Sequence, residues 1–204
     1  MTNTNLREIF DHYAELYGYT THGEMSFAFT DKGSNHTYIE FYTKYMEPKR
    51  EDVSLLEIGI MTGGSFLLWQ KYFQKYKLVG IDLAETFYKI KPFQKDIESD
   101  PNIQLYFNTD STRVVPKSLS DYKFDFIIDD GNHNLVPQTE TLINYWPYLK
   151  ENGTYFIEDV SNSSYIKTFT KALEQLNAKF TFEVYEGIID KRHDDRIFAV
   201  TKSI

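Results

Sequence analysis

From residue 53 onward, short apolar runs alternate with stretches of helical periodicity, and this alternation limits the possible folds more than any other feature. Alternating units of this length predict right-handed crossovers, and therefore an α/β fold with a mostly parallel sheet and helices on both faces. The predicted strands are Val53–Gly59, Leu78–Leu83, Ile103–Asn108, Phe124–Asp130 and Thr154–Glu158. The predicted helices are Gly64–Lys75, Glu85–Asp96, Pro137–Lys150, which ends before Asn152-Gly153, and Ser164–Asn177.

The two ends of the chain depart from this pattern. Lys179–Glu186 and Arg196–Lys202 alternate polar and apolar residues, and only about ten residues separate them. That is too short for a helical crossover, so they predict an antiparallel pair at the sheet edge, joined by a solvated turn at the charged run Asp190–Arg196. Residues 1–50 predict a helix at Leu6–Tyr17 and then a polar segment, Thr30–Tyr38. We expect residues 1–50 to form an amino-terminal cap or lid over the ligand-binding end of a domain at 51–204, within one structural domain.

Composition excludes several classes of function. The net charge of the 204 residues is −8 and no dense run of Lys or Arg is present, which argues against a nucleic-acid partner. The chain has no cysteine, so disulfides, thiolate metal sites and cysteine nucleophiles are excluded. The amino terminus does not resemble a secretory signal, and no stretch approaches the roughly 18 apolar residues of a membrane span. We expect a cytoplasmic protein that does not bind membranes.

A glycine-containing turn after the first strand predicts a nucleoside ligand. In Glu57-Ile-Gly-Ile-Met-Thr-Gly-Gly-Ser65, Gly59 permits a sharp turn, and the Gly63-Gly64 pair lets backbone approach a ligand. The next strand ends at Asp82, near the spacing at which an acidic residue meets a ribose diol. The G-x-x-x-G spacing favours S-adenosylmethionine over a dinucleotide. Alternatively, the glycines tighten the turn and Asp82 caps the next helix.

Two predicted strands end in carboxylates. Asp129 and Asp130 end one strand, with His133 three residues later, and Glu158 and Asp159 follow another. Ligands bind at the carboxyl ends of parallel strands, so these groups predict a divalent cation with a general base beside it. The alternatives are a simple Asp-Gly-Asn turn, a helix cap at Glu158-Asp159 and a structural histidine.

These motifs together resemble class I S-adenosylmethionine-dependent methyltransferases with a Rossmann-like sheet. More narrowly, Glu57–Gly64, Val79–Asp82 and Phe124–His133 are similar to the metal-dependent sugar O-methyltransferases of macrolide biosynthesis, of the mycinamicin type. The resemblance covers about residues 30–160, and Asn132 replaces the serine that is usual in that pattern. The spacing from Asp130 to the later acidic pair also resembles catechol O-methyltransferase.

The resemblance implies a methyl transfer to a sugar hydroxyl and a role for each residue in it. The acceptor would be a deoxysugar, a nucleotide sugar or a glycan. Mg²⁺ or Mn²⁺ would be bound by Asp130, Glu158 and Asp159, with Asp129 a further candidate ligand, and His133 would be the catalytic base beside Asp130. His36 and Tyr38 would contact the acceptor. The residues assigned to S-adenosylmethionine are Glu57, Gly59, Ile60, Thr62, Gly63, Ser65, Asp82, Asp110, Asp129 and Lys32.

Several alternatives stay open at this point. Asp110 meets the adenine amino group or caps Ser111 and Thr112, and His36 contacts a ligand or structures its loop. The acceptor is a sugar or a catechol-type phenol. A nicotinamide-dependent oxidoreductase and a non-catalytic scaffold with the cofactor fold are the other hypotheses. A homodimer through the tyrosine-rich amino-terminal cap is the expected protein partner.

Overall fold

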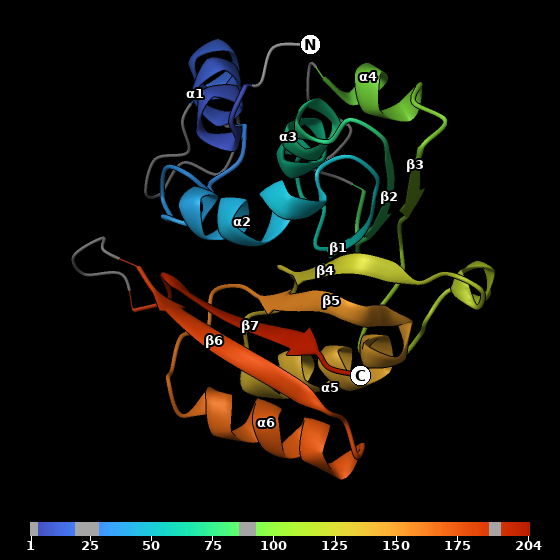
Figure 1. The fold of residues 1–204 in the computed structure, drawn as a ribbon. Coiled ribbons are helices and arrows are strands. Elements are labelled where there is room, and N and C mark those ends of the chain that lie inside the picture. Colours follow the sequence, from blue (N-terminus) through green and yellow to red (C-terminus); the bar gives the residue numbers. More distant parts are fainter. Residues whose placement is uncertain (1–3, 19–28, 86–92, 188–192) are drawn as a thin grey trace.

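The protein is described by a computed structural model, which covers residues 4–18, 29–85, 93–187 and 193–204. Seven strands form one sheet in the order β3-β2-β1-β4-β5-β7-β6 (Figure 1). All pairings from β3 to β5 are parallel, and β7 is antiparallel to both β5 and β6, as the spacing of the last two runs predicted. The strands are β1 Val53–Ile58, β2 Tyr76–Ile81, β3 Ile103–Tyr106, β4 Phe124–Asp129, β5 Leu149–Ile157, β6 Phe180–Glu186 and β7 Arg196–Lys202.

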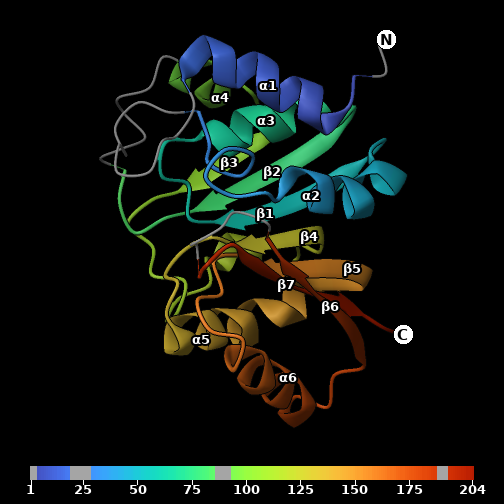
Figure 2. The ribbon, with the colours of Figure 1, turned by 90° about the vertical axis from the view of Figure 1, so that its left-hand side faces the viewer.

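Helices cover both faces of the sheet, which confirms the predicted architecture (Figure 2). Four lie on one face, namely α1 Leu6–Tyr17, α2 Ile39–Met46, α3 Gly64–Tyr72 and α4 Gln94–Glu98. Two lie on the other, namely α5 Leu135–Tyr145 and α6 Tyr165–Gln175. Short 3-10 turns occur at η1 Glu47–Lys49, η3 Lys117–Leu119 and η4 Trp146–Tyr148. No helix in these described ranges has the length and apolarity needed to cross a membrane.

The amino-terminal residues belong to the core of the first face. Helix α1 begins with a capping box, in which the Asn5 side chain accepts from the Glu8 N–H and the Glu8 side chain accepts from the Asn5 N–H. Its apolar stripe, with Leu6 and Phe10 fully buried, joins one apolar cluster with residues of α2, α3 and the sheet. Helices α1 and α2 therefore pack in one layer with α3 on this face of the sheet.

The structure corrects the predicted boundary between α5 and β5. The helix ends at Tyr145 instead of Lys150, and β5 begins at Leu149 instead of Thr154. The η4 turn that follows the helix contains Pro147, which cannot donate a helical hydrogen bond. Asn152, expected beyond the helix end, lies inside β5 with a φ of +60°, and the pairing with β4 shifts register there. The predicted helix Glu85–Asp96 lies mostly outside the described residues, and a short helix occurs at Gln94–Glu98.

Candidate functional site

The turn between β1 and α3 brings three parts of the chain into close contact. Gly59 has a φ of +93°, and a Cβ there would lie 2.0 Å from the backbone oxygen of Asp130. A Cβ at Gly64 would lie 1.4 Å from the backbone oxygen of Phe29. The Thr62 hydroxyl donates to that same oxygen at 3.2 Å. Gly64 is therefore needed for the approach of residues 29–30, which the sequence did not reveal.

The acidic residue at the end of β2 binds this turn directly. Asp82 Oδ2 accepts from the N–H groups of Ile60, at 2.7 Å, and Met61, at 2.9 Å, while its Oδ1 accepts from the Ala84 N–H at 3.0 Å. Asp82 thus lies at the predicted nucleoside site and orders its loop. Its contact with a ribose stays a prediction.

Other predicted cofactor residues, within the turn or next to it, have buried side chains. Ile60, Thr62 and Ser65 are buried, and so is Glu57. The Glu57 carboxylate accepts from Trp69 Nε1 at 2.9 Å. These buried side chains pack beneath the backbone of the turn and support its shape.

The carboxyl ends of β4 and β5 lie side by side, as predicted. The Glu158 N–H donates to the Asp129 carbonyl at 3.0 Å, which aligns the two acidic pairs. Among the described residues, Asp130, His133 and Asp159 each offer a ligand atom, and these atoms lie within 4.8 Å of one another. His133 Nε2 is 3.4 Å from Asp130 Oδ1, and His133 Nδ1 is 3.4 Å from Asp159 Oδ2. Two carboxylates and an imidazole in this arrangement can hold a divalent cation.

Glu158 contacts a buried lysine that it shares with Asp130. Lys32 Nζ lies 2.7 Å from both Glu158 Oε1 and Asp130 Oδ2, and 3.3 Å from Glu57 Oε1. Tyr42 also donates its hydroxyl hydrogen to Glu158. The Lys32 and Glu158 side chains are 0% and 1% exposed. Lys32 as a cofactor residue and Glu158 as a metal ligand therefore stay predictions, because in this structure the two bind each other.

The buried charges shift one another's pKa. Burial opposes ionisation of Asp130, but the Lys32 ammonium and the hydrogen bond with His133 hold the pKa of Asp130 well below its usual range. Burial also disfavours the imidazolium, yet Asp130, Asp159 and Glu158 raise the pKa of His133 to about 10. Burial raises the pKa of Asp159 to about 6. Without a bound cation, His133 is consequently protonated at neutral pH.

Asp129 and Asp110 are not members of the group formed by Asp130, His133 and Asp159. Asp129 is buried, and burial raises its pKa to about 7. Asp110 Oδ1 accepts from the Thr112 N–H at 3.0 Å and from the Thr112 hydroxyl at 2.6 Å, which is the capping alternative. Their predicted contacts with the cofactor are not tested by these interactions.

The polar segment before α2 contacts the acidic pair from the other side. The Tyr38 hydroxyl lies 2.8 Å from Asp159 Oδ1, and His36 Nε2 lies 3.3 Å from the same oxygen. Both side chains are buried, so in this structure they contact the protein, and their contact with an acceptor stays a prediction. The charged run before β7 was expected to be solvated, but Asp195 within it is 4% exposed and lies 3.4 Å from His36 Nδ1. Neither the role of Tyr42 nor that of Asp195 had a local signal in the sequence.

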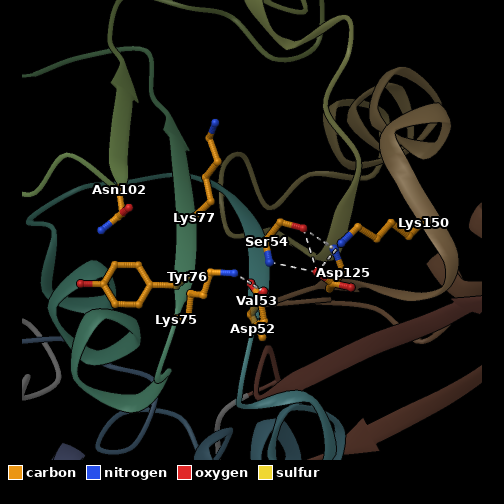
Figure 3. Close-up of a pocket in the computed structure, with 9 residues that line it drawn as sticks. All are labelled: Asp52, Val53, Ser54, Lys75, Tyr76, Lys77, Asn102, Asp125 and Lys150. Carbon is orange, nitrogen blue, oxygen red and sulfur yellow. Dashed lines mark hydrogen bonds and ion pairs between the residues drawn. The ribbon is translucent and has the colours of Figure 1, made fainter.

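A separate hollow of ≈ 430 Å³ lies at the opposite, amino-terminal ends of β1 and β2 (Figure 3). Lys75 and Lys150, which line it, are paired with Asp52 and Asp125 at 2.5 and 2.7 Å. It contains none of the predicted site residues. Since parallel sheets bind ligands at their carboxyl ends, the acidic edge is the better candidate for chemistry.

No protein-family model matches the chain. Curated proteins of similar sequence do match it, and they include sugar O-methyltransferases. Over 144 residues the chain is 27% identical to 8-demethyl-8-alpha-L-rhamnosyl tetracenomycin-C 2'-O-methyltransferase of Streptomyces olivaceus, a match that covers 66% of this chain and 36% of that protein. Over 141 residues it is 26% identical to mycinamicin VI 2''-O-methyltransferase of Micromonospora griseorubida, which covers 65% and 34%. The match spans about a third of the length of each relative.

Solved structures match over nearly the whole chain. MycE methyltransferase from the mycinamycin biosynthetic pathway, solved with Mg and SAH, has a TM-score of 0.71 and 19% identity over 98% of this chain and 55% of its own. Another MycE structure, which also holds mycinamycin VI, has a TM-score of 0.70. At this identity the likeness establishes the fold. The homologues of this chain are thus sugar O-methyltransferases, as its motifs predicted, and its fold is the Rossmann-like methyltransferase fold.

Proposed function

We propose that this chain is an S-adenosylmethionine-dependent O-methyltransferase that uses a divalent cation and acts on a sugar hydroxyl. The observation that carries this proposal is the group Asp130, His133 and Asp159, which converges at the carboxyl edge of β4 and β5. That edge adjoins the turn at Gly59, where the backbones of β1 and β4 touch. The predicted methyl-donor site and the acidic group are therefore neighbours.

The residues present fit a hard divalent cation. Asp130 and Asp159 each direct a carboxylate oxygen toward His133, and oxygen ligands suit Mg²⁺ and Mn²⁺. Asp130 and Asp159 would hold the cation, with Glu158 the predicted third ligand. The Gly59–Gly63 turn and Asp82 would hold S-adenosylmethionine. When bound, the cation lowers the pKa of an acceptor hydroxyl, and S-adenosylmethionine supplies the methyl group.

In this proposal, His133 accepts the proton of that hydroxyl. Its side chain is 41% exposed, whereas Asp159 beside it is 8% exposed, so the imidazole is the group that an acceptor can reach. Although burial opposes it, Asp130, Asp159 and Glu158 raise the pKa of His133 to about 10, so it becomes a base at neutral pH only when their charge is neutralised. Asp130 and Asp159 each lie 3.4 Å from one ring nitrogen and orient the imidazole. The role of His133 as a base therefore depends on a cation bound by Asp130 and Asp159.

The nature of the acceptor rests on homology alone. The name of the first curated relative contains a rhamnosyl group attached to a larger molecule, but this chain matches only 36% and 34% of the lengths of the two relatives. A deoxysugar, a nucleotide sugar and a glycan are therefore all included in the proposal. The cytoplasmic location and the dimer through the amino-terminal cap also stay predictions.

The test is methyl transfer from labelled S-adenosylmethionine to nucleotide-linked deoxysugars and simple catechols, with Mg²⁺ or with EDTA. We expect Mg²⁺-dependent transfer to a sugar, loss of turnover in Asp130→Asn with donor binding retained, and unchanged turnover in the exposed Asp121→Asn control. Weaker donor binding in Asp82→Ala would support the cofactor site. Transfer only to catechols would mean that the acceptor is a phenol and not a sugar. Full activity of Asp130→Asn in excess EDTA would refute the metal mechanism.

A further inference from the structure

The Asp195 side chain is buried and hydrogen-bonded, although it lies in a charged loop. Its carboxylate accepts from the Thr37 N–H at 3.1 Å and from the Thr37 hydroxyl at 3.0 Å. A Cβ at Gly187 would lie only 1.7 Å from Asp195 Oδ2, so the glycine makes room for this carboxylate. The side chain is 1% exposed. A solvated turn residue would have none of these features.

The Asp195 carboxylate faces an imidazole that in turn faces Asp159. His36 Nδ1 is 3.4 Å from Asp195 Oδ1, and His36 Nε2 is 3.3 Å from Asp159 Oδ1. The ring is 1% exposed and stacks on Tyr38, with centroids 4.6 Å apart and planes 21° apart. The Tyr38 hydroxyl reaches the same Asp159 oxygen. Oδ1 of Asp159 is thereby used within the protein, while Oδ2 faces His133 at 3.4 Å.

The topology explains how these residues meet. Strand β7 is antiparallel to β5, so it begins at the edge of the sheet where β5 ends. Asp195, just before β7, and Asp159, just after β5, are therefore brought to the same edge. The Val160 N–H donates to the Arg196 carbonyl at 3.1 Å and joins the two segments there. His36 lies between the two carboxylates.

We propose that Asp195 is a positioning residue for Asp159 and acts through His36. This inference rests on the proposed function, in which Asp159 is a metal ligand. A carboxylate behind an imidazole fixes the orientation of the ring, and groups that support metal ligands in this way alter metal affinity by about 10- to 100-fold. The Asp195 carboxylate, 3.4 Å from Nδ1, holds the His36 ring so that Nε2 engages Asp159 Oδ1, and Asp159 Oδ2, on the His133 side, would hold the cation.

The experiment measures Mn²⁺ binding from the electron paramagnetic resonance signal of the free ion, without S-adenosylmethionine or acceptor. Asp195→Asn should raise the dissociation constant for Mn²⁺ by about tenfold, at the lower end of that range. His36→Gln should raise it at least as much, and the double variant should bind no more weakly than His36→Gln alone. Tyr185→Phe is the matched control, because its hydroxyl holds Thr37 at 2.7 Å without contacting His36, and it should change binding less than twofold.

Each outcome decides the inference. Wild-type affinity in Asp195→Asn, additive losses in the double variant, or an equal loss in Tyr185→Phe would overturn it while the metal site stands. If Asp159→Asn binds Mn²⁺ like wild type, or wild type does not bind it, the proposed metal site fails and the positioning role with it. Should Asp195→Asn fail to fold, as judged by circular dichroism, a loss in His36→Gln that Tyr185→Phe lacks would support the inference, and equal behaviour of the two would refute it.

Discussion

Replacing Lys32 by methionine tests whether one buried ammonium balances the acidic interior. Its Nζ contacts Asp130 and Glu158 at 2.7 Å and Glu57 at 3.3 Å, with no exposed side-chain area. Methionine fills a similar volume but leaves these carboxylates without their counter-charge. Removing one partner of a buried ion pair costs roughly 3–5 kcal/mol, a large part of the roughly 5–15 kcal/mol by which domains are stable.

The assay is urea unfolding at pH 7, followed by circular dichroism in EDTA. With a slope of about 2–3 kcal/mol per M, the expected loss lowers the urea midpoint by roughly 1–2.5 M. The difference should shrink in acid. Despite its burial, Asp130 has a folded pKa below the unfolded value of 3.8, so its stabilisation is present above that pH and is lost as the pH falls through the folded pKa.

Lys44→Met is the matched control, because Lys44 pairs with Glu183 while the two side chains are 57% and 42% exposed. An exposed pair contributes about 0–1 kcal/mol, so this variant should unfold near the wild-type midpoint. A loss below about 1 kcal/mol in Lys32→Met, or equal losses in the two variants, would refute the reasoning that Lys32 neutralises the interior.

Three further variants test the scaffold by the same unfolding assay. Gly64→Ala should cost about 1–3 kcal/mol, since its Cβ would lie 1.4 Å from the Phe29 oxygen; wild-type stability would mean that the two segments separate freely. Trp69→Phe removes the 2.9 Å hydrogen bond to buried Glu57 and should cost about 1–3 kcal/mol, which a neutral result would contradict. Burial opposes ionisation of Asp125, yet its hydrogen bonds lower its pKa below 3.8, so its stabilisation is present above that value. Asp125→Asn should therefore cost about 1–2 kcal/mol at pH 7, and this cost should shrink as the pH falls through the folded pKa of Asp125; a loss independent of pH would exclude this electrostatic origin.

The sheet could be predicted from the sequence because its signals are local. Apolar runs identified the strands, and the short spacing before Arg196–Lys202 identified the antiparallel edge. The boundary at Tyr145 was missed because the apolar periodicity continues past it, although Pro147 was a sign that the helix had ended. Local propensity thus located the elements better than their ends.

The candidate site was only partly readable for the opposite reason. Asp130, His133 and Asp159 lie at strand ends, and parallel pairing brings strand ends together whatever the side chains are. Lys32 and Asp195 are buried against partners that are distant in the sequence. Lys32 is separated by 98 residues from its partner Asp130, and Asp195 is separated by 158 residues from its partner Thr37. Charged residues in polar stretches look solvated until the fold supplies those partners.

The contact between Thr37 and Asp195 also sets when the site forms during synthesis. It closes a span of 158 residues in a chain of 204, so most of the chain must be made before His36 and Tyr38 can be fixed over Asp159. Contacts of such separation are entropically costly and form late. A nascent chain that has completed β1 to β5 can pair its parallel strands, but its acidic edge stays open to solvent. The acidic edge is therefore completed only when β7 enters between β5 and β6.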